Sequence, residues 1–213
     1  MFKQQFTNMN FNFKVRIIYK IMFYLLFDFE TTGVGKDFMK QRAIQIAWLL
    51  IEKVGENYTE LSKHSYLLKN NVTEINEDFH GENITMDMLK NDSTEEQIVF
   101  DLFLKDLVTI TQNNGKLVAH NIDFDFNILK RELTINGLDN RIDWFKLKNM
   151  KFCTMKKGVK ICKIEKEYNG EIIYKYPKLI ELYTHFHGHE PDVSLHLAHN
   201  DVEVMYECLK HMV

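Results

Sequence analysis

One nearly unbroken apolar run that ends in two acids constrains the fold of this chain more than any other feature. The run MFYLLFDFE covers residues 22–30, is rich in aromatic side chains and is followed by Thr-Thr-Gly. An apolar run of strand length with aromatic enrichment is typical of a strand buried on both faces. We therefore expect residues 22–30 to form the central strand of a sheet, with two carboxylates at its end.

Further apolar runs predict the rest of the sheet. Strands are expected at residues 43–52, at 64–69 with a weaker pattern, and at 116–120. Three sequential strands with short connections favour an antiparallel meander. The alternation of strand and helix that follows predicts parallel strands in the same sheet. The sequence thus predicts one α/β domain on a mixed sheet flanked by helices.

Apolar residues at helical spacing predict four helices, at residues 94–110, 124–136, 178–187 and 196–211. Ser93 and Glu96 fit a capping box at the start of the first helix. Gly137 is expected to end the second helix. Residues 71–93 are polar and predict a loop with one short helical turn.

Charge is spread unevenly along the chain, although its net charge is only −3. Residues 1–27 carry four basic residues and no acid, and residues 146–178 carry ten lysines and three glutamates. A protein near neutrality can therefore present a basic face to phosphate. A solvated lysine-rich surface is the alternative interpretation. Within the basic stretch, residues 160–176 alternate around Asn169-Gly170, which predicts a small projecting β-hairpin.

The composition excludes several classes of protein. A length of 213 residues suits one domain, and 45% hydrophobic residues is too high for a disordered chain. Three scattered cysteines make no paired motif, so neither a disulfide framework nor a zinc cluster is expected. The cytoplasm or another reducing compartment is then the default location. No run of about 18 uncharged apolar residues exists, so no membrane span is expected.

The N-terminal residues 1–21 differ in composition from the rest. They are basic, free of acids and rich in Phe and Asn. We interpret them as a disordered, non-catalytic extension, and residues 22–213 as the folded domain. The composition is compatible with a weak organelle-targeting peptide, although the Arg and Ser richness of such signals is lacking. A true start at Met22 is the other interpretation left open.

A first pair of acids stands at the end of the expected central strand. Asp28 and Glu30 are two residues apart, so they share a face and lie about 6–7 Å apart along the backbone. Two carboxylates at a buried strand end are costly without a counter-charge, and a divalent cation removes that cost. A pair of solvated acids is the alternative interpretation.

Two further clusters combine acids with histidines. AHNIDFDFNIL places Asp123 and Asp125 in the first turn of a helix, where capping and the helix dipole also explain an acid. SLHLAHND holds His196 and Asp201 five residues apart, with His199 between them. If the helix begins near residue 198, His196 lies on the preceding loop and can lean over a site. A histidine beside an acid cluster is a candidate base.

FDFETTG, HNIDFD and HLAHND, in this order, resemble the three motifs of the DEDDh exonucleases, the DnaQ-like family whose best-known member is the proofreading subunit of bacterial DNA polymerase III. The family motifs read DxE, HNxxFD and HxxxxD. This sequence also has an additional acid, Asp123, and an additional histidine, His199, within the motifs. The spacing of the family motifs selects Asp125 and His196 instead. The matching residues are Asp28, Glu30, Asp125, His196 and Asp201. The resemblance covers nearly all of residues 22–213.

The resemblance implies a ribonuclease H-like fold with a five-stranded mixed sheet. It implies 3′→5′ hydrolysis of phosphodiester bonds at the 3′ end of DNA, expected to be single-stranded, with release of nucleoside 5′-monophosphates. It further implies two Mg²⁺ ions, with Mn²⁺ as a substitute. In this resemblance His196 orients or deprotonates the attacking water. The implied metal ligands are Asp28, Glu30, Asp125 and Asp201.

Substrate contacts are expected beside these motifs. The resemblance implies contacts from Thr31, Thr32, His120 and Phe124. Lys156 and Lys157, with the tyrosines of the basic stretch, are expected to track a single strand through phosphate contacts and stacking.

The resemblance also indicates the partners of the chain. We expect nucleic acid 3′ ends, DNA before RNA, with a DNA polymerase or replication complex as a further partner. A 3′→5′ exoribonuclease of the same family, which would recognise the 2′-OH, is one alternative. A catalytically silent nucleic-acid-binding module is the other.

Overall fold

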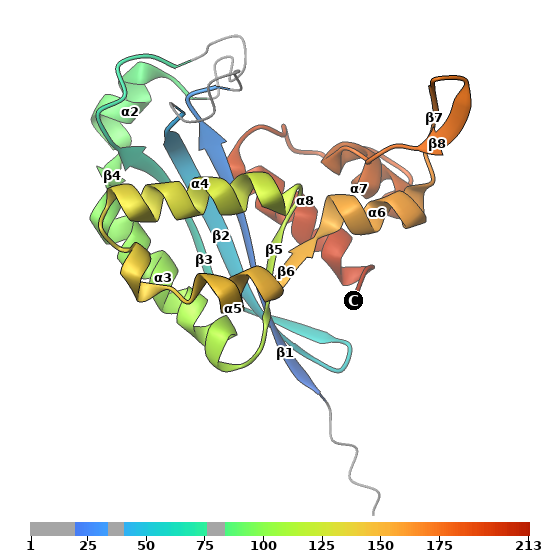
Figure 1. Cartoon of the computed structure of the whole chain (residues 1–213), viewed down its shortest axis with the longest axis horizontal. Coiled ribbons are helices and arrows are strands. Elements are labelled where there is room, and N and C mark those ends of the chain that lie inside the picture. The colour runs from blue at the N-terminus through green and yellow to red at the C-terminus, as the bar shows by residue number, and fades with distance from the viewer. Residues whose placement is uncertain (1–19, 34–40, 76–83) are drawn as a thin grey trace, which may run out of the picture.

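A twisted mixed sheet with helices on both faces forms the centre of the molecule (Figure 1). The computed structural model describes residues 20–33, 41–75 and 84–213. In this part of the chain the sheet has six strands in the order β4-β3-β2-β1-β5-β6. The strands are β1 (Ile21–Thr31), β2 (Ala43–Val54), β3 (Asn57–Lys69), β4 (Thr94–Glu95), β5 (Lys116–Ala119) and β6 (Lys151–Cys153).

The strand directions confirm the expected mixed sheet. Strands β1, β2 and β3 form an antiparallel meander, and β5 and β6 continue the sheet parallel to β1. Beyond the five strands that were expected, the two-residue strand β4 pairs with the end of β3 at one edge. Because β5 and β6 run parallel to β1, all three strands end at the same side of the sheet.

Strand β1 is central and buried on both faces, as its apolar run predicts. Leu25, Phe27 and Phe29 join the core cluster beneath helices α3, α4 and α5. Tyr24 and Leu26 point the other way and pack against α7 and α8. Alternation along the strand places Asp28 and Glu30 with this second set, on the face that α8 covers.

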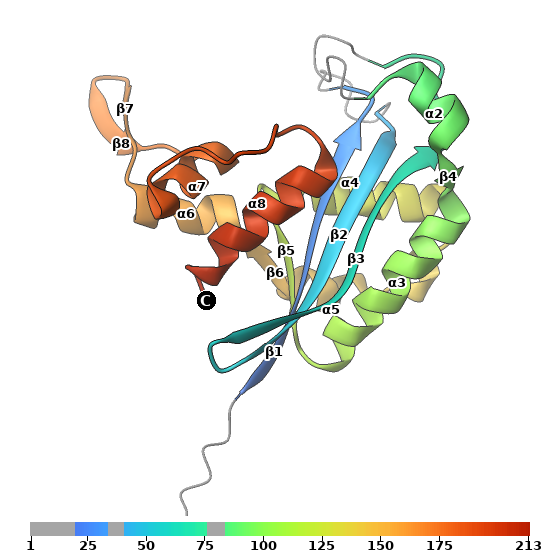
Figure 2. The ribbon, with the colours of Figure 1, turned by 180° about the vertical axis from the view of Figure 1, so that it is seen from behind.

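The helices form the outer layers of the fold (Figures 1 and 2). None of those in the described residues is long and apolar enough to cross a membrane. A 3-10 turn, η2, covers Asp139–Arg141. The helices are α2 (Met86–Asp92), α3 (Glu96–Gln112), α4 (Ile122–Ile135), α5 (Trp144–Asn149), α6 (Thr154–Cys162), α7 (Leu179–His187) and α8 (Ala198–Lys210).

The structure departs from the predicted elements where the sequence pattern is weak. Strand β3 begins at Asn57, seven residues before the predicted strand. Its first part has a partner strand on one side only and one exposed, polar face, so its apolar pattern is weak. The capping box was wrong: Ser93 follows α2 and its hydroxyl donates to the Leu89 carbonyl, while Glu95 precedes α3 without a side-chain cap. Helices α5 and α6 were not predicted.

Glu96 instead joins a buried ion-pair network that ties the sheet to the helices. The Arg42 guanidinium donates to Glu132 at 3.0 Å and to Glu96 at 2.7 Å. Glu132 is fully buried and also accepts from the Ala43 N–H. Removing one partner would leave an uncompensated buried charge, so this network fixes the start of β2 against α3 and α4.

The predicted hairpin is present and forms a small sheet of its own. Strands β7 (Glu165–Tyr168) and β8 (Glu171–Tyr174) pair with each other and project from the body in both views (Figures 1 and 2). The predicted N-terminal extension lies outside the described residues up to residue 19, and Ile21 already belongs to β1.

Candidate active site

Three carboxylates converge where β1 meets the beginning of α8. Asp28 and Glu30 come from the α8-covered face of β1, and Asp201 comes from the first turn of α8. One carboxylate oxygen from each of the three lies within 4.8 Å of the others. Residues 173 positions apart in sequence thus form one acidic cluster, which agrees with the expectation from their motifs.

Asp125 adds a fourth carboxylate from the first turn of α4. Its Oδ1 accepts a hydrogen bond from the Phe29 N–H at 3.2 Å, so the backbone of β1 holds it between the positions of Asp28 and Glu30. Asp125 is only 2% exposed. Its charge helps to raise the pKa of both Asp28 and Glu30, which places it at the same site.

His196 lies on the loop between α7 and α8, as a helix that begins at Ala198 requires. Its backbone has a φ of 71°, a left-handed conformation that is uncommon for a residue other than glycine. Such conformations cluster at functional sites, where the surrounding structure enforces them. The backbone of His196 hydrogen-bonds the Asp201 carboxyl, so loop and helix position each other.

The pKa values of the four carboxyls are all raised, because burial disfavours their charged forms; repulsion by neighbouring carboxylates adds to this for Asp28, Glu30 and Asp125. Burial raises the pKa of Glu30 to about 8, and neighbouring Asp201 adds to the effect. Burial raises the pKa of Asp125 to about 8 and that of Asp201 to about 6. The pKa of Asp28 lies well above its usual range for the same reason. Without a cation, the four groups resist simultaneous ionisation.

The donor set fits a divalent cation. Every group is a carboxylate, and hard oxygen donors suit Mg²⁺ and Mn²⁺. The Oδ1 atom of Asp201 is buried and has no hydrogen-bond partner among the described residues. A buried oxygen without a donor, among carboxyls with raised pKa values, is an environment that a bound cation would complete.

The raised pKa values predict that the metal-free protein loses stability as pH rises. The unfolded chain releases these protons near pH 4, whereas in the folded site Asp201 retains its proton up to about pH 6, and Glu30 and Asp125 retain theirs up to about pH 8. The unfolded state binds fewer protons across this window, so the free energy of unfolding falls as pH increases. Melting temperatures in EDTA should therefore fall between pH 5 and pH 8, and Mg²⁺ should reverse the loss at pH 8. A flat profile in EDTA would contradict this prediction.

A cleft of about 490 Å³ opens onto the cluster, and Asp28, Asp201 and His196 line it. The other wall includes Lys178 and Leu179 at the start of α7. Lys178 was not singled out from sequence, because one lysine within a lysine-rich stretch carries no signal of its own. The cleft thus brings the side chains of Lys178 and His196 to the acidic cluster.

His120 lines the same cleft, but both of its ring nitrogens are engaged. Nε2 lies 3.1 Å from the Pro177 carbonyl, to which it must donate, and Nδ1 lies 3.0 Å from the Thr154 hydroxyl. Burial lowers the pKa of His120 to about 4. The neutral ring therefore joins the end of β5 to α6 and to the segment before α7. Any contact with substrate would use its carbon edge or ring face.

The other expected substrate contacts lie near the cluster without lining the cleft. Thr31 is buried and its hydroxyl donates to the Gly33 carbonyl at 3.1 Å. The Thr32 hydroxyl accepts from the Arg42 N–H at 3.3 Å. Phe124 is partly buried against the α3–α4 core. Residues 34–40, which follow the two threonines, lie outside the described part of the chain.

The structure separates the extra acid and the extra histidine from the site. Asp123 pairs with Lys151 and Lys156, and these hydrogen bonds lower its pKa to about 2. His199 points to another pocket, which Trp48 and His64 also line. Motif spacing had selected Asp125 and His196, and the structure brings those two to the acidic cluster.

Lys156 and Lys157 both lie on α6, next to the cleft rather than inside it. Lys156 is paired with Asp123, and the Lys157 ammonium lies 5.6 Å from the centre of the Phe152 ring. All seven charged residues of 146–163 are lysines, whereas 164–178 has as many acids as bases. The basic character of the stretch therefore belongs to α5, β6 and α6, and not to the hairpin.

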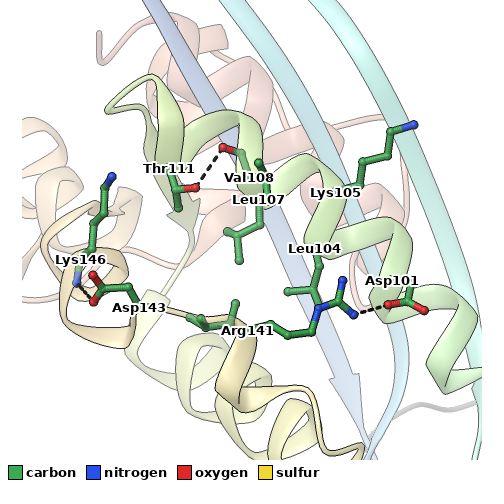
Figure 3. A pocket seen from close by; sticks show the side chains of 10 residues that line it. Asp101, Leu104, Lys105, Leu107, Val108, Thr111, Arg141, Asp143 and Lys146 are labelled. Carbon is green, nitrogen blue, oxygen red and sulfur yellow. Dashed lines mark hydrogen bonds and ion pairs between the residues drawn. The ribbon is translucent and has the colours of Figure 1, made fainter.

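A second pocket of about 410 Å³ lies between α3 and the segment around α5 (Figure 3). Two of its acids already have partners: Arg141 donates to Asp101 at 2.5 Å, and Asp143 caps α5 by accepting from the Lys146 backbone N–H. Leu104 and Leu107 supply apolar lining. The four clustered carboxyls contribute nothing to this pocket, so we place the chemistry at the cleft beside β1.

Known proteins match the part of the chain that contains this site. The family model RNase_T, described as Exonuclease, matches residues 25–209. E. coli Exonuclease I in complex with a 5cy-dT13 oligonucleotide is 18% identical, with a TM-score of 0.60 over 90% of this chain and 40% of that one. A zinc-bound E. coli ExoI–ssDNA complex is 16% identical, with a TM-score of 0.63 over 89% and 40%.

These likenesses differ in what they establish. At such identities the solved structures show a shared fold, and this chain spans about 40% of their length. No curated protein matches the chain by sequence. The match to the family model extends from β1 to α8 and includes all the residues of the acidic cluster.

Proposed function

The chain belongs to the RNase_T family of exonucleases, hydrolases that act on phosphodiester bonds, and from this premise we propose that it removes nucleotides from the 3′ end of single-stranded DNA. The observation that carries the proposal is the convergence of the buried carboxyls with His196 on one cleft. We propose DNA rather than RNA as the substrate because the fold matches structures that were solved with ssDNA oligonucleotides.

The four carboxylates Asp28, Glu30, Asp125 and Asp201 are proposed to hold two Mg²⁺ or Mn²⁺ ions, which when bound activate water and neutralise the leaving oxygen. Asp28, Glu30 and Asp201, whose oxygens lie close together, would hold the ions directly. Asp125 lies outside this three-carboxylate cluster and would add its charge from the first turn of α4.

His196 is proposed to orient the attacking water and to accept its proton at a ring nitrogen. The water oxygen forms a bond to phosphorus, and the bond from phosphorus to the 3′ oxygen of the preceding nucleotide breaks. The leaving 3′ oxygen takes a proton from solvent and His196 releases its proton to solvent, so the products are a nucleoside 5′-monophosphate and a strand with a new 3′-hydroxyl. The left-handed backbone of His196 and its hydrogen bond to Asp201 favour this role, because both fix the loop over the cluster.

Digestion of 5′-labelled strands tests the proposal directly. With Mg²⁺ and single-stranded DNA we expect a ladder that shortens one nucleotide at a time and stops when EDTA is added. Matched RNA, digested in parallel, is expected to react more slowly, and faster degradation of RNA would identify an exoribonuclease instead. Internal cuts, or no cleavage with any strand, would overturn the proposed function.

A DNA polymerase or replication complex is the protein partner that we propose from the family resemblance. A duplex with a mismatched 3′ terminus distinguishes this role from scavenging of free strands. Faster excision from the mismatched end than from the paired end is expected for a proofreading or repair enzyme. Equal rates at both ends would argue against proofreading.

The lysines of α6 and its end are expected to bind phosphate. Replacing Lys156, Lys157, Lys160 and Lys163 by glutamine should weaken binding of a dT20 strand and flatten its salt dependence. Each phosphate contact contributes about 0.7 to the slope for single strands, so the slope should fall by up to about 3. Fluorescence anisotropy at several salt concentrations measures both quantities.

The control removes lysines of the same stretch at the opposite end of the sheet. Lys146 and Lys148 lie on α5, before β6, whereas the cleft lies at the ends of the parallel strands. Replacing both by glutamine should leave the slope nearly unchanged. If the α6 variant binds dT20 like the unaltered protein, its lysines are only a solvated surface.

A further inference from the structure

The β7–β8 hairpin displays apolar side chains that the rest of the protein does not cover. All eight of its strand residues are exposed, and among the described residues these two strands pair only with each other. Tyr168 is 59% exposed, Ile172 64% and Tyr174 51%. An isolated two-stranded hairpin is only marginally stable, and an uncovered apolar surface marks a contact site.

The turn and the base of the hairpin are both well defined. Asn169 and Gly170 have φ values of 52° and 81°, the left-handed pair that a tight two-residue hairpin turn requires. At the base, the Lys175 N–H donates to the Ile164 carbonyl at 2.9 Å, and its ammonium pairs with Glu181 at 2.5 Å. The hairpin is therefore held in one direction.

The base of the hairpin continues directly into the wall of the cleft. His120, which lines the cleft, donates to the carbonyl of Pro177, and Lys178 lines the cleft itself. Gly158 of α6 packs so closely on Pro177 that a Cβ there would lie 2.8 Å from the proline ring. The base of the hairpin at Lys175 therefore lies only three residues along the chain from Lys178, which lines the cleft.

The net negative charge of the hairpin strands disfavours a main role in holding phosphates. Residues 165–174 carry one lysine and three glutamates, whereas residues 146–163 carry seven lysines and no acid. The two faces of the hairpin also differ. Glu165 and Glu167 lie opposite Tyr174 and Ile172 on one face, which has no cation. A phosphodiester backbone would be repelled there.

The other face is neutral and combines an aromatic ring with a cation. Lys166 lies opposite Ile173, and Tyr168 lies opposite Glu171. Aromatic side chains stack on the bases of single strands without reading their sequence. Tyr168, next to the turn, is the most exposed aromatic residue of the hairpin.

We propose that the Lys166–Tyr168–Ile173 face of the hairpin contacts the bases of single-stranded DNA upstream of the cleft, by stacking rather than by phosphate contacts. This inference rests on the proposed function for the identity of the strand. It divides recognition into two parts: the α6 lysines hold phosphates, and the hairpin holds bases.

The two exposed tyrosines on opposite faces supply a matched test. Tyr168→Ala should weaken binding of dT20 in EDTA by about tenfold, the loss expected for one stacked base, and leave the salt slope unchanged. Tyr168→Phe should restore binding because it keeps the ring. Tyr174→Ala, an equal truncation on the acidic face, should bind like the unaltered protein. Circular dichroism checks that each variant is folded.

Equal losses for Tyr168→Ala and Tyr174→Ala would overturn the choice of face. No loss for Tyr168→Ala, or a flattened salt slope, would overturn the base contact itself. With Mg²⁺, kcat/KM for dT20 should fall in Tyr168→Ala, while that for the dinucleotide dT2, too short to reach the hairpin, should not. If the unaltered protein binds dT20 but hydrolyses neither substrate, the proposed function fails while the binding result still decides the hairpin contact.

Discussion

Replacing Asp28 by asparagine is expected to reduce metal-dependent hydrolysis of single-stranded DNA by about 10³-fold or more. Asp28 lies at the centre of the acidic cluster, and Asp125, Asp201 and Glu30 all raise its pKa. Loss of a proposed metal ligand should remove several kcal/mol of transition-state stabilisation, and each 1.4 kcal/mol corresponds to a factor of ten. The measurement is kcat/KM on a 5′-labelled strand with saturating Mg²⁺.

The same substitution is expected to stabilise the metal-free protein. Burial of the Asp28 carboxyl among three others raises its pKa, so its charge destabilises the folded state near neutral pH. Asparagine has nearly the same shape and removes that charge. The melting temperature in EDTA at pH 8 should therefore rise, while the stabilisation by Mg²⁺ should diminish.

Asp123→Asn is the matched control for Asp28→Asn. Asp123 is also an acid of the three motifs, but it pairs with Lys151 and Lys156 outside the cluster. Its loss should leave hydrolysis within a few-fold of the unaltered rate. Full activity of Asp28→Asn with an intact metal response would show that the chemistry lies elsewhere.

The sequence predicted the elements whose apolar pattern is local. Strands β1, β2 and β5 are continuous apolar runs because both of their faces are buried. Strand β3 was predicted too short, since its exposed face is polar and its first half has a partner on one side only. Helix α6 was missed because its last residues, 160–162, were assigned to the predicted hairpin, and because Gly158 lowers helix propensity.

The contacts that position the site residues join segments far apart in the sequence, so no local sequence pattern predicts them. The motif spacing selected Asp125 over Asp123, but only the fold shows that the Phe29 N–H holds Asp125 and that two lysines hold Asp123. The hydrogen bond from the neutral His120 ring to the Pro177 carbonyl joins residues that are 57 positions apart in the sequence. Such long-range hydrogen bonds appear only when the sheet is assembled.

Replacing His196 is expected to lower kcat by about 10²–10⁴-fold, the usual contribution of a general base, with metal affinity retained. Because its φ of 71° strains most side chains, two variants are needed. His196→Ala removes the imidazole, and His196→Asn also removes it but tolerates the left-handed backbone. Equal losses in both would identify the imidazole, rather than the shape of the loop, as the cause.

His199→Ala provides the comparison, because His199 is a neighbouring imidazole that lines a different pocket. It should hydrolyse DNA at the unaltered rate. Calorimetric titration with Mn²⁺ should give similar affinities for the His196 variants and the unaltered protein, since the carboxylates are intact. If the His196 variants lose metal affinity in proportion to kcat, the histidine supports the Asp201 carboxylate through its loop. If they keep the metal and also keep the pH dependence of kcat, a group other than His196 removes the proton from water.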